Sequence, residues 1–248
     1  MAAGPGIRPG AAGAPFAAGR SARNYPHLVA ASLGLALVDV TYSGATTANL
    51  LAERQCGARP QIDALDGSES LVTITVGGND VGYVQLLTAA SLPRVAQMLP
   101  MIAALIDRRA RDQALAQVEE SLKTVGEAVR ARAPRARVLF VDYLSLLPPA
   151  GVRAAPLSDA DAELGRYVAA GLEKRTAAAA VATGCVVVRA AEASREHHAF
   201  SADPWTVGAG WPLPWRPMPF HPNAAGMAAV ANLVVAKLND EQAAQGRS

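Results

Sequence analysis

The sequence has little cysteine and few aromatic residues. Two cysteines, Cys56 and Cys185, occur in 248 residues, and neither lies in a CxxC motif or at metal-ligand spacing from histidines, so the thiols give no sign of a metal site. Isolated structural thiols are the simplest interpretation, because a disulfide would require the fold to bring the two together. Aromatic residues make up 5% of the chain, which is too sparse for a platform that stacks nucleic-acid bases.

Excess charge and long apolar runs are also lacking. A formal net charge of +2 does not indicate a nucleic-acid-binding surface. No apolar run reaches the roughly 18 residues that span a bilayer, so no transmembrane segment is expected. Residues 1–7 lack the regions of a signal peptide. Localisation therefore stays unknown: cytoplasmic for the chain as given, and secreted if a signal peptide lies upstream.

What the sequence does contain is an alternation of strand and helix patterns. With 51% hydrophobic residues it can build a sizeable core, and we expect one domain over residues 1–248. A loop is expected at 1–22, and a second at 200–222, which holds six prolines and all three tryptophans. Apolar β-branched runs predict strands, and apolar residues at helical spacing predict helices. The strands are expected at 35–42, 71–76, 137–144 and 185–190; the helices at 24–33, 47–53, 82–109 (broken near Pro93 and Pro100), 112–132, 158–183 and 223–239. This order is typical of an α/β fold with a parallel sheet.

The most informative stretch is residues 71–80. A buried apolar strand ends there in Gly-Gly-Asn-Asp. Ligands of parallel α/β sheets bind outside the carboxyl ends of the strands, where the Asn79 amide is well placed to donate a hydrogen bond to an oxyanion. A simple strand-to-helix turn explains the same residues, with the glycines supplying the unusual backbone angles.

Other polar segments occur at residues 43–44 and 221–223, and here the sequence resembles the SGNH (GDSL-type) hydrolases, in their bacterial esterase and lipase branch. The matching blocks are Arg-Asn-Tyr-Pro at 23–26, Ser-Gly-Ala-Thr-Thr at 43–47, Gly-Gly-Asn-Asp-Val-Gly at 77–82 and Phe-His-Pro-Asn-Ala-Ala-Gly at 220–226.

The resemblance implies a three-layer α/β/α, flavodoxin-like fold that hydrolyses carboxylic esters through an acyl-enzyme. It assigns His221 as the general base, and the Gly44 N–H and the Asn79 side chain as donors to the oxyanion. Donors fixed in advance stabilise the charge of an acyl-transfer transition state, and a histidine can accept and return the serine proton.

Two departures from the family pattern stand out. Many members place an Asp three residues before the histidine, where this chain has Met218. Related esterases orient the histidine with a backbone carbonyl, so we predict that the Met218 carbonyl does so here, with Asp203 as a weaker alternative.

The second departure concerns the nucleophile. The family's serine ends the first, central strand, and in this alignment Met1 falls just after that serine. We therefore expect the serine and its strand immediately upstream of Met1. Ser43 is a weaker substitute, because a turn hydroxyl that bonds to the local backbone explains it. A chain that lacked the nucleophile would instead be a binding module or an inactive relative with the same fold.

The remaining expectations concern the substrate and other ligands. Trp211, Trp215 and Phe220 are candidates for a wall that binds the acyl group, although packing of a proline-rich loop explains them equally well. His197 and His198, near two glutamates, suggest either a metal patch or a solvated helix face, and we favour the latter. We expect a small-molecule or lipid ester as substrate, no metal or organic cofactor, no nucleic acid, and a monomer.

Overall fold

Three short apolar segments form a parallel sheet in the computed structural model, which describes residues 1–213 and 216–245. The strands are β1 (Leu71–Ile74), β2 (Arg137–Val141) and β3 (Val186–Val188), and they lie in the order β1-β2-β3. Continuous apolar runs favour a sheet that is buried on both faces. Three of the four predicted strands are therefore confirmed.

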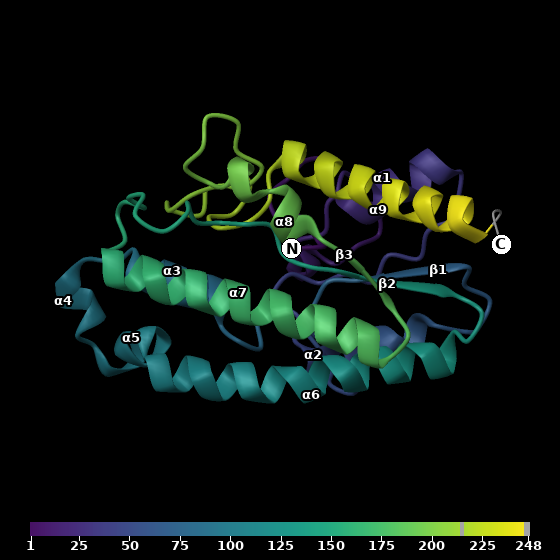
Figure 1. The fold of residues 1–248 in the computed structure, drawn as a ribbon, viewed down its shortest axis with the longest axis horizontal. Helices are drawn as coiled ribbons and strands as arrows, with labels where there is room; N and C mark the ends of the chain where they lie inside the picture. Colours follow the sequence, from purple (N-terminus) through teal and green to yellow (C-terminus); the bar gives the residue numbers. More distant parts are fainter. Residues whose placement is uncertain (214–215, 246–248) are drawn as a thin grey trace.

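Helices cover both faces of this sheet (Figure 1). One face carries α3 (Tyr83–Ala90), α6 (Arg108–Arg132) and α7 (Asp159–Ala182), and the other carries α1 (Tyr25–Leu33) packed on α9 (Ala224–Gln245). This is the expected three-layer α/β/α arrangement. Helix α9 is longer than the predicted 223–239, since the Ala-rich sequence continues to favour helix.

The other helices of the described chain are short. As predicted, the apolar region after residue 82 is helical but interrupted at Pro93 and Pro100, because proline lacks the N–H that would continue a helix. These short elements are α2 (Thr47–Leu51), α4 (Arg94–Gln97), α5 (Pro100–Ala103), α8 (Ala190–Ala193), and the 3-10 turns η1 (Phe16–Ala18), η2 (Gln61–Ala64), η3 (Ala104–Ile106) and η4 (Arg195–His197).

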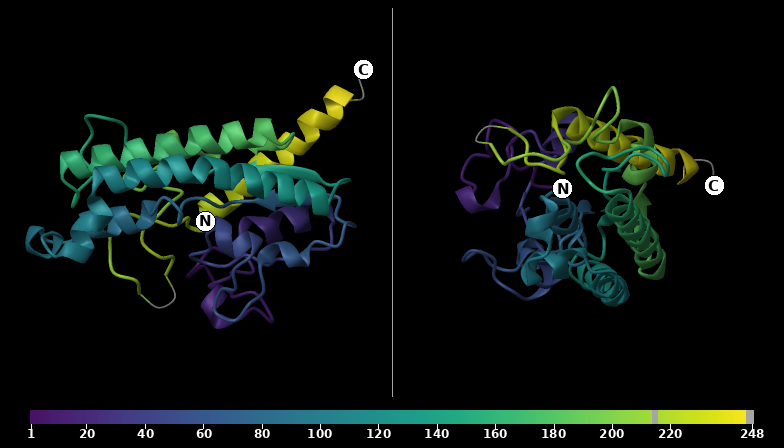
Figure 2. Two further views of the ribbon diagram at one scale, coloured as in Figure 1. Left: turned by 90° about the horizontal axis from the view of Figure 1, so that it is seen from below. Right: turned by 90° about the vertical axis from the view of Figure 1, so that its left-hand side faces the viewer.

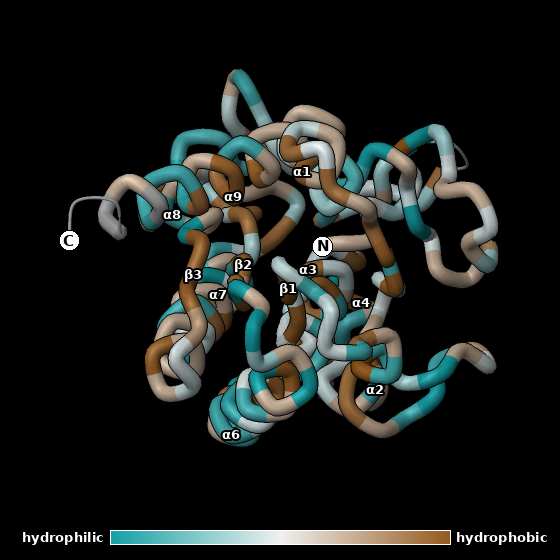
Figure 3. The backbone as a smooth tube through the Cα atoms, turned by 90° about the vertical axis from the view of Figure 1, so that its right-hand side faces the viewer, coloured by the Kyte–Doolittle hydropathy of each residue, from teal (hydrophilic) through white to brown (hydrophobic). Residues whose placement is uncertain are grey.

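Strand β2 divides the core into two parts. Val138 and Phe140 pack into the cluster beneath α3, α6 and α7, whereas Leu139 and Val141 pack into the cluster beneath α1 and α9. Successive side chains of a strand point to opposite faces, so one five-residue run supplies both cores. Figure 3 shows these hydrophobic strands between the two helical layers.

Side-chain caps set the start of the two longest helices on the α6–α7 face. The Ser158 hydroxyl accepts from the Asp161 N–H at 3.2 Å and so caps α7 where the helix was expected to begin. Helix α6 begins at Arg108 rather than at Asp112, because the Asp107 carboxylate accepts from the Ala110 N–H and satisfies the first turn.

The fourth predicted strand, residues 35–42, does not form. The segment is extended but pairs with no strand among the described residues, and Val38 is 75% exposed. A groove of about 470 Å³ is lined by this segment on one side and by the outer edge of β1 on the other. A strand pairs with a neighbour about 4.8 Å away. The groove separates residues 35–42 from β1, so the two do not pair.

Asp39 anchors this extended segment on the far side of the groove. Its carboxylate accepts from the Asn24 amide and from the Thr41 N–H, both at 2.8 Å, and lies 3.5 Å from the Arg20 guanidinium. A buried carboxylate is costly unless it is paired and hydrogen-bonded. These bonds therefore hold the segment beside α1 and away from β1.

Asp142, directly after β2, is a buried carboxyl group that forms no ion pair within the described part of the chain. Its Oδ1 accepts from the Ala191 N–H at 2.8 Å and so ties the end of β2 to α8. Burial raises the pKa of Asp142 to about 7, although the N–H bond and the charge of Arg189 oppose this.

We expect Asp142→Asn to make the free energy of unfolding less dependent on pH. The unfolded carboxyl loses its proton near pH ~4, whereas the folded one keeps it to about pH 7. The folded chain therefore binds more protons in this interval, and its stability falls as the pH rises. Relative to the parent, the variant should gain up to about 4 kcal/mol between acid and mildly alkaline pH.

Urea unfolding at several pH values measures this difference. The exposed Glu196→Gln is the matched control, and its difference from the parent should not change over the interval. A gain for Asp142→Asn that is the same at every pH would contradict the assignment.

Candidate active site

Three loops with polar residues meet around one small cavity. Its volume is about 30 Å³, and it is lined by Gly44, Asn79 and His221 together with Met1. Gly44 lies just before α2, Asn79 follows β1, and His221 precedes α9. The structure thus brings together the three residues that the sequence predicted to share a site.

The Asn79 amide is held at both ends. Its Nδ2 donates to the Ala45 carbonyl at 2.9 Å, and its Oδ1 accepts from the Gln85 side chain at 3.2 Å. An amide nitrogen carries two hydrogens, so one N–H of Asn79 is left after the bond to Ala45. The group is therefore fixed in orientation and retains a donor at the cavity.

Asp80 links the two loops that carry Gly44 and Asn79. Its carboxylate accepts from the Thr47 N–H at 3.0 Å and from the Thr47 hydroxyl at 2.5 Å. Thr47 is the first residue of α2, where a negative charge is favoured by the helix dipole. Gly44 has φ +79°, a backbone conformation that side chains rarely adopt. These contacts fix the Gly44 N–H relative to the Asn79 amide.

Gly78 is required by a packing contact with Tyr143. The Gly78 N–H donates to the Tyr143 hydroxyl at 3.0 Å. A Cβ at position 78 would lie 2.6 Å from the Tyr143 ring, which is closer than real contacts allow. Tyr143 follows β2 and lines both the small cavity and the groove, so it forms the wall between them.

His221 has a defined tautomer. Its Nδ1 lies 2.8 Å from the Pro219 carbonyl, which can only accept, so Nδ1 carries the proton and Nε2 is left as an acceptor. The predicted partner was the Met218 carbonyl. That carbonyl instead accepts from the His221 backbone N–H at 3.1 Å, because the tight turn places it opposite the peptide group rather than the ring.

This turn contains an unusual backbone angle. Phe220 has φ +56°, and its side chain is 2% exposed. A bulky residue in this conformation is an outlier that the surrounding structure has to hold in place. Burial of the Phe220 ring in the core supplies that restraint, so Phe220 anchors the loop beneath His221.

The electrostatics of His221 favour the neutral ring. Burial, the largest cause, lowers the pKa of His221 to about 4. The positive charge of the Met1 α-amino group lowers this pKa further, whereas the hydrogen bond to the Pro219 carbonyl raises it. Burial also lowers the pKa of the Met1 amino group, to about 6. At neutral pH the ring is therefore able to accept a proton.

Other predicted residues lie away from this cavity. The Asp203 carbonyl accepts from His197 at 2.8 Å, and its side chain is directed to His197 rather than to His221. Trp211 is 83% exposed and does not line the cavity, because the loop carries it outward; Phe220 does line it. Trp215 lies outside the described residues.

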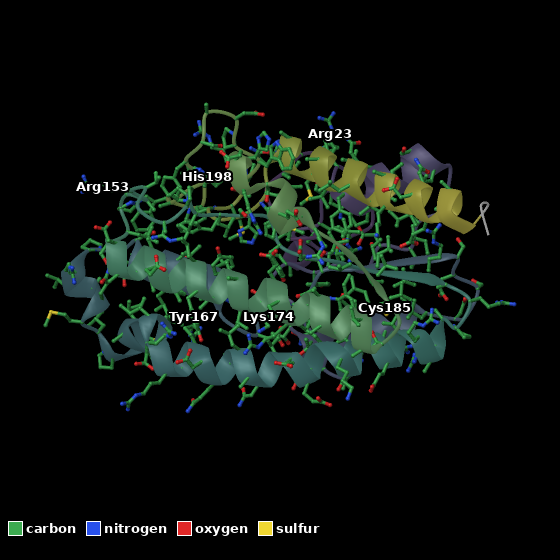
Figure 4. All side chains as sticks on the ribbon, in the orientation of Figure 1. Arg23, Arg153, Tyr167, Lys174, Cys185 and His198 are labelled. Carbon is green, nitrogen blue, oxygen red and sulfur yellow. The ribbon has the colours of Figure 1, made fainter. Side chains whose placement is uncertain are left out.

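The neighbouring histidines have structural contacts. His197 stacks on Trp205 with ring centroids 4.1 Å apart, and His198, labelled in Figure 4, accepts from the Phe200 N–H at 3.1 Å. The described residues contain no group of three or more His, Cys, Asp or Glu side chains placed to hold a metal ion. Cys56 and Cys185 are both free thiols.

Three contributors to the site were missed by sequence reasoning: Gln85, Tyr143 and Pro219. Tyr143 reaches the site through a contact with Gly78 that is distant in sequence, although its position at the end of a predicted strand was a usable signal. Gln85 lies six residues after Asn79, in the helix that follows. None of the helices in the described chain has the length and apolar composition needed to cross a bilayer.

With this geometry established, the chain can be compared with known proteins. Residues 1–229 match the GDSL-like Lipase/Acylhydrolase family. The chain is 34% identical over 227 residues to Lipase 2 of Streptomyces coelicolor, which covers 86% of this chain and 74% of that protein. It is 28% identical over 210 residues to a lipase of Streptomyces rimosus, covering 84% and 73% of the two chains.

Solved structures agree with this result. The phospholipase A1 of Streptomyces albidoflavus NA297 matches with a TM-score of 0.77 and 26% identity, over 93% of this chain and 94% of that one. The extracellular lipase of Streptomyces rimosus matches with a TM-score of 0.71 and 26% identity, over 90% and 92%.

We expect Gly78→Ala to destabilise the protein by about 1–3 kcal/mol, the usual cost of overpacking. The added methyl must displace the Tyr143 ring and break the bond to its hydroxyl. Chemical unfolding measures the loss. Gly208→Ala is the matched control, because a Cβ at that position makes only ordinary contacts at 3.7 Å or more. Equal stability of the two variants would show that the Tyr143 contact does not constrain position 78.

Proposed function

Because the chain belongs to the GDSL-like lipase/acylhydrolase family and is a serine ester hydrolase of that family, we propose that it cleaves carboxylic esters through an acyl-enzyme for which His221 is the general base. The observation that carries this proposal is the arrangement of His221, Gly44 and Asn79 around one cavity. The Nε2 of His221 would accept the proton of the nucleophile, and the two N–H groups would donate to the oxygen of the ester carbonyl that the nucleophile attacks.

The chemistry follows from these atoms. A serine Oγ attacks the ester carbonyl carbon as Nε2 of His221 takes the hydroxyl proton, and the carbonyl oxygen becomes an oxyanion. When the tetrahedral intermediate collapses, the C–O bond breaks and the imidazolium returns the proton to the departing alcohol. Water then attacks the acyl-serine while Nε2 of His221 accepts one of its protons. The imidazolium returns this proton to the serine oxygen as the acid is released. The Pro219 carbonyl keeps the ring in the required tautomer throughout.

The oxyanion would be held by the Gly44 N–H and the free N–H of Asn79. No hydrogen bond engages the Gly44 N–H within the described structure, so this donor is available. Gln85 and the Ala45 carbonyl hold the Asn79 amide before substrate arrives. Donors that need no reorganisation contribute most to stabilising charge in the transition state.

The nucleophile is proposed to come from an extended segment that precedes Met1 and lies in the groove. Met1 lines both the groove and the small cavity. The outer edge of β1 and the segment 35–42 face each other across the groove without a partner, and a strand between them would pair with both. Such a strand would end at Met1 and so place its last side chain beside His221.

The substrate class is supported by the relatives, which are lipases and a phospholipase A1. We propose a small-molecule or lipid ester for this chain as well. Phe220 and Tyr83 contribute apolar surface to the cavity and would contact the acyl group close to the carbonyl. Trp211, exposed on the same loop, would contact only the more distant part of a long substrate.

In a chain that carries the upstream serine, Asn79→Ala is expected to lower kcat for p-nitrophenyl ester hydrolysis by about 100–1,000-fold, the usual loss for one oxyanion donor. KM should change little, because the donor acts mainly in the transition state. His221→Ala should abolish turnover, and His197→Ala, which changes a histidine in η4 away from the cavity, should not. Activity that survives His221→Ala would refute the proposed mechanism.

A chain extended by an apolar strand of about six residues that ends in serine just before Met1 should gain esterase activity over the chain as given. The matched control ends the same strand in alanine. The extension also converts the Met1 amino group to an amide, so the pKa of His221 should rise in an NMR titration with either strand. If neither the activity nor this pKa changes, the strand does not occupy the groove.

A further inference from the structure

The segment after α3 exposes apolar side chains at one end of the molecule. Helices α4 and α5 project at the left-hand end of Figure 1, and the left-hand view of Figure 2 shows the same segment projecting at that end. Neither helix contains a buried residue. We define the apolar tip as Val95, Met98, Leu99 and Met101, whose exposures lie between 58% and 81%.

The apolar tip is more exposed to solvent than α3, the helix that precedes it in the chain. Leu86 and Leu87 of α3 are fully buried, whereas the apolar tip contacts solvent. Between residues 93 and 106 the only charged side chain is Arg94. Contiguous apolar surface of this kind on a soluble protein marks an interaction site.

The charges around the apolar tip are mainly positive. Arg94, Arg108 and Arg109 are exposed beside it, and Arg94 and Arg109 form no ion pair within the described residues. Asp107 caps α6 and is exposed, and Asp112 pairs with Arg108 at 3.1 Å, so the three arginines outnumber the two acids beside the tip. Arg153, labelled in Figure 4, lies at the same end of the molecule.

Helix α3 connects the apolar tip to the candidate active site along the chain. Helix α3 begins at Tyr83, which lines the small cavity, and ends three residues before α4. The loop that carries His221 exposes Trp211 and Leu213, and Figure 1 shows that it extends toward the same end of the molecule. The apolar tip and the loop that carries His221 therefore lie toward one end of the molecule.

We propose that the apolar tip docks the chain on anionic phospholipid surfaces, with the arginines beside the headgroups and the apolar side chains among the acyl chains. Projecting apolar side chains flanked by cations are typical of interfacial binding. The tip projects from the molecule (Figure 1), and its residues line neither the groove nor the small cavity. The inference rests on the proposed ester hydrolysis, because docking would present lipid esters to the cavity.

Cosedimentation of the 248-residue chain with vesicles tests the docking directly. Phosphatidylglycerol vesicles should bind it at least about 10-fold more tightly than phosphatidylcholine vesicles, since basic residues near the surface favour anionic lipid. Met98→Asp/Met101→Asp should reduce this binding about 10-fold or more, because charge at an inserting position is unfavourable. The matched control is Val181→Asp, a residue that is 80% exposed at the far end of α7.

Equal binding of the double variant and the control would overturn the proposal, and so would equal binding to the two lipids. Loss of self-association in gel filtration, without loss of vesicle binding, would instead assign the apolar tip to contact between copies of the chain. Circular dichroism of each variant should match that of the parent, which checks that the variants are folded. His221→Ala should bind vesicles like the parent, so failure of docking and failure of the proposed hydrolysis are read separately.

Discussion

The outer edge of β1 faces a groove rather than another strand, and most of the structure around the site depends on how that edge is completed. Backbone N–H and C=O groups that are removed from water need hydrogen-bond partners. The extended segment 35–42 lies across the groove, held there by Asp39. The position between them is therefore defined on both sides, with Tyr143 at the end that meets the candidate site.

Around the cavity, each candidate catalytic group is positioned by an atom that does not itself react. Asp80 holds the start of α2 relative to the end of β1, Gln85 orients the Asn79 amide, and the Pro219 carbonyl sets the tautomer of His221. Local strain at Phe220 is balanced by burial of its ring. Such preorganisation is what electrostatic catalysis requires.

Local sequence patterns predict most of the fold. The run at 137–141, the cap at Ser158 and the breaks at Pro93 and Pro100 were all predictable, because they depend on periodicity, capping and a missing N–H. Residues 35–42 have the composition of a strand, but pairing depends on a neighbour that the segment cannot specify. Choosing between the Met218 and Pro219 carbonyls required the geometry of a turn with positive φ at Phe220. Tyr143 acts through a contact with Gly78 that is distant in sequence.

The open edge of β1 also bears on how the chain behaves at high concentration. A free strand edge beside exposed apolar residues such as Val38 is a template for pairing with another polypeptide. No bulge or lysine interrupts residues 71–74, and both are devices by which proteins protect such edges. Colloidal stability and catalytic competence are thereby coupled: whatever fills the groove both completes the sheet and removes the surface through which copies of the chain would aggregate.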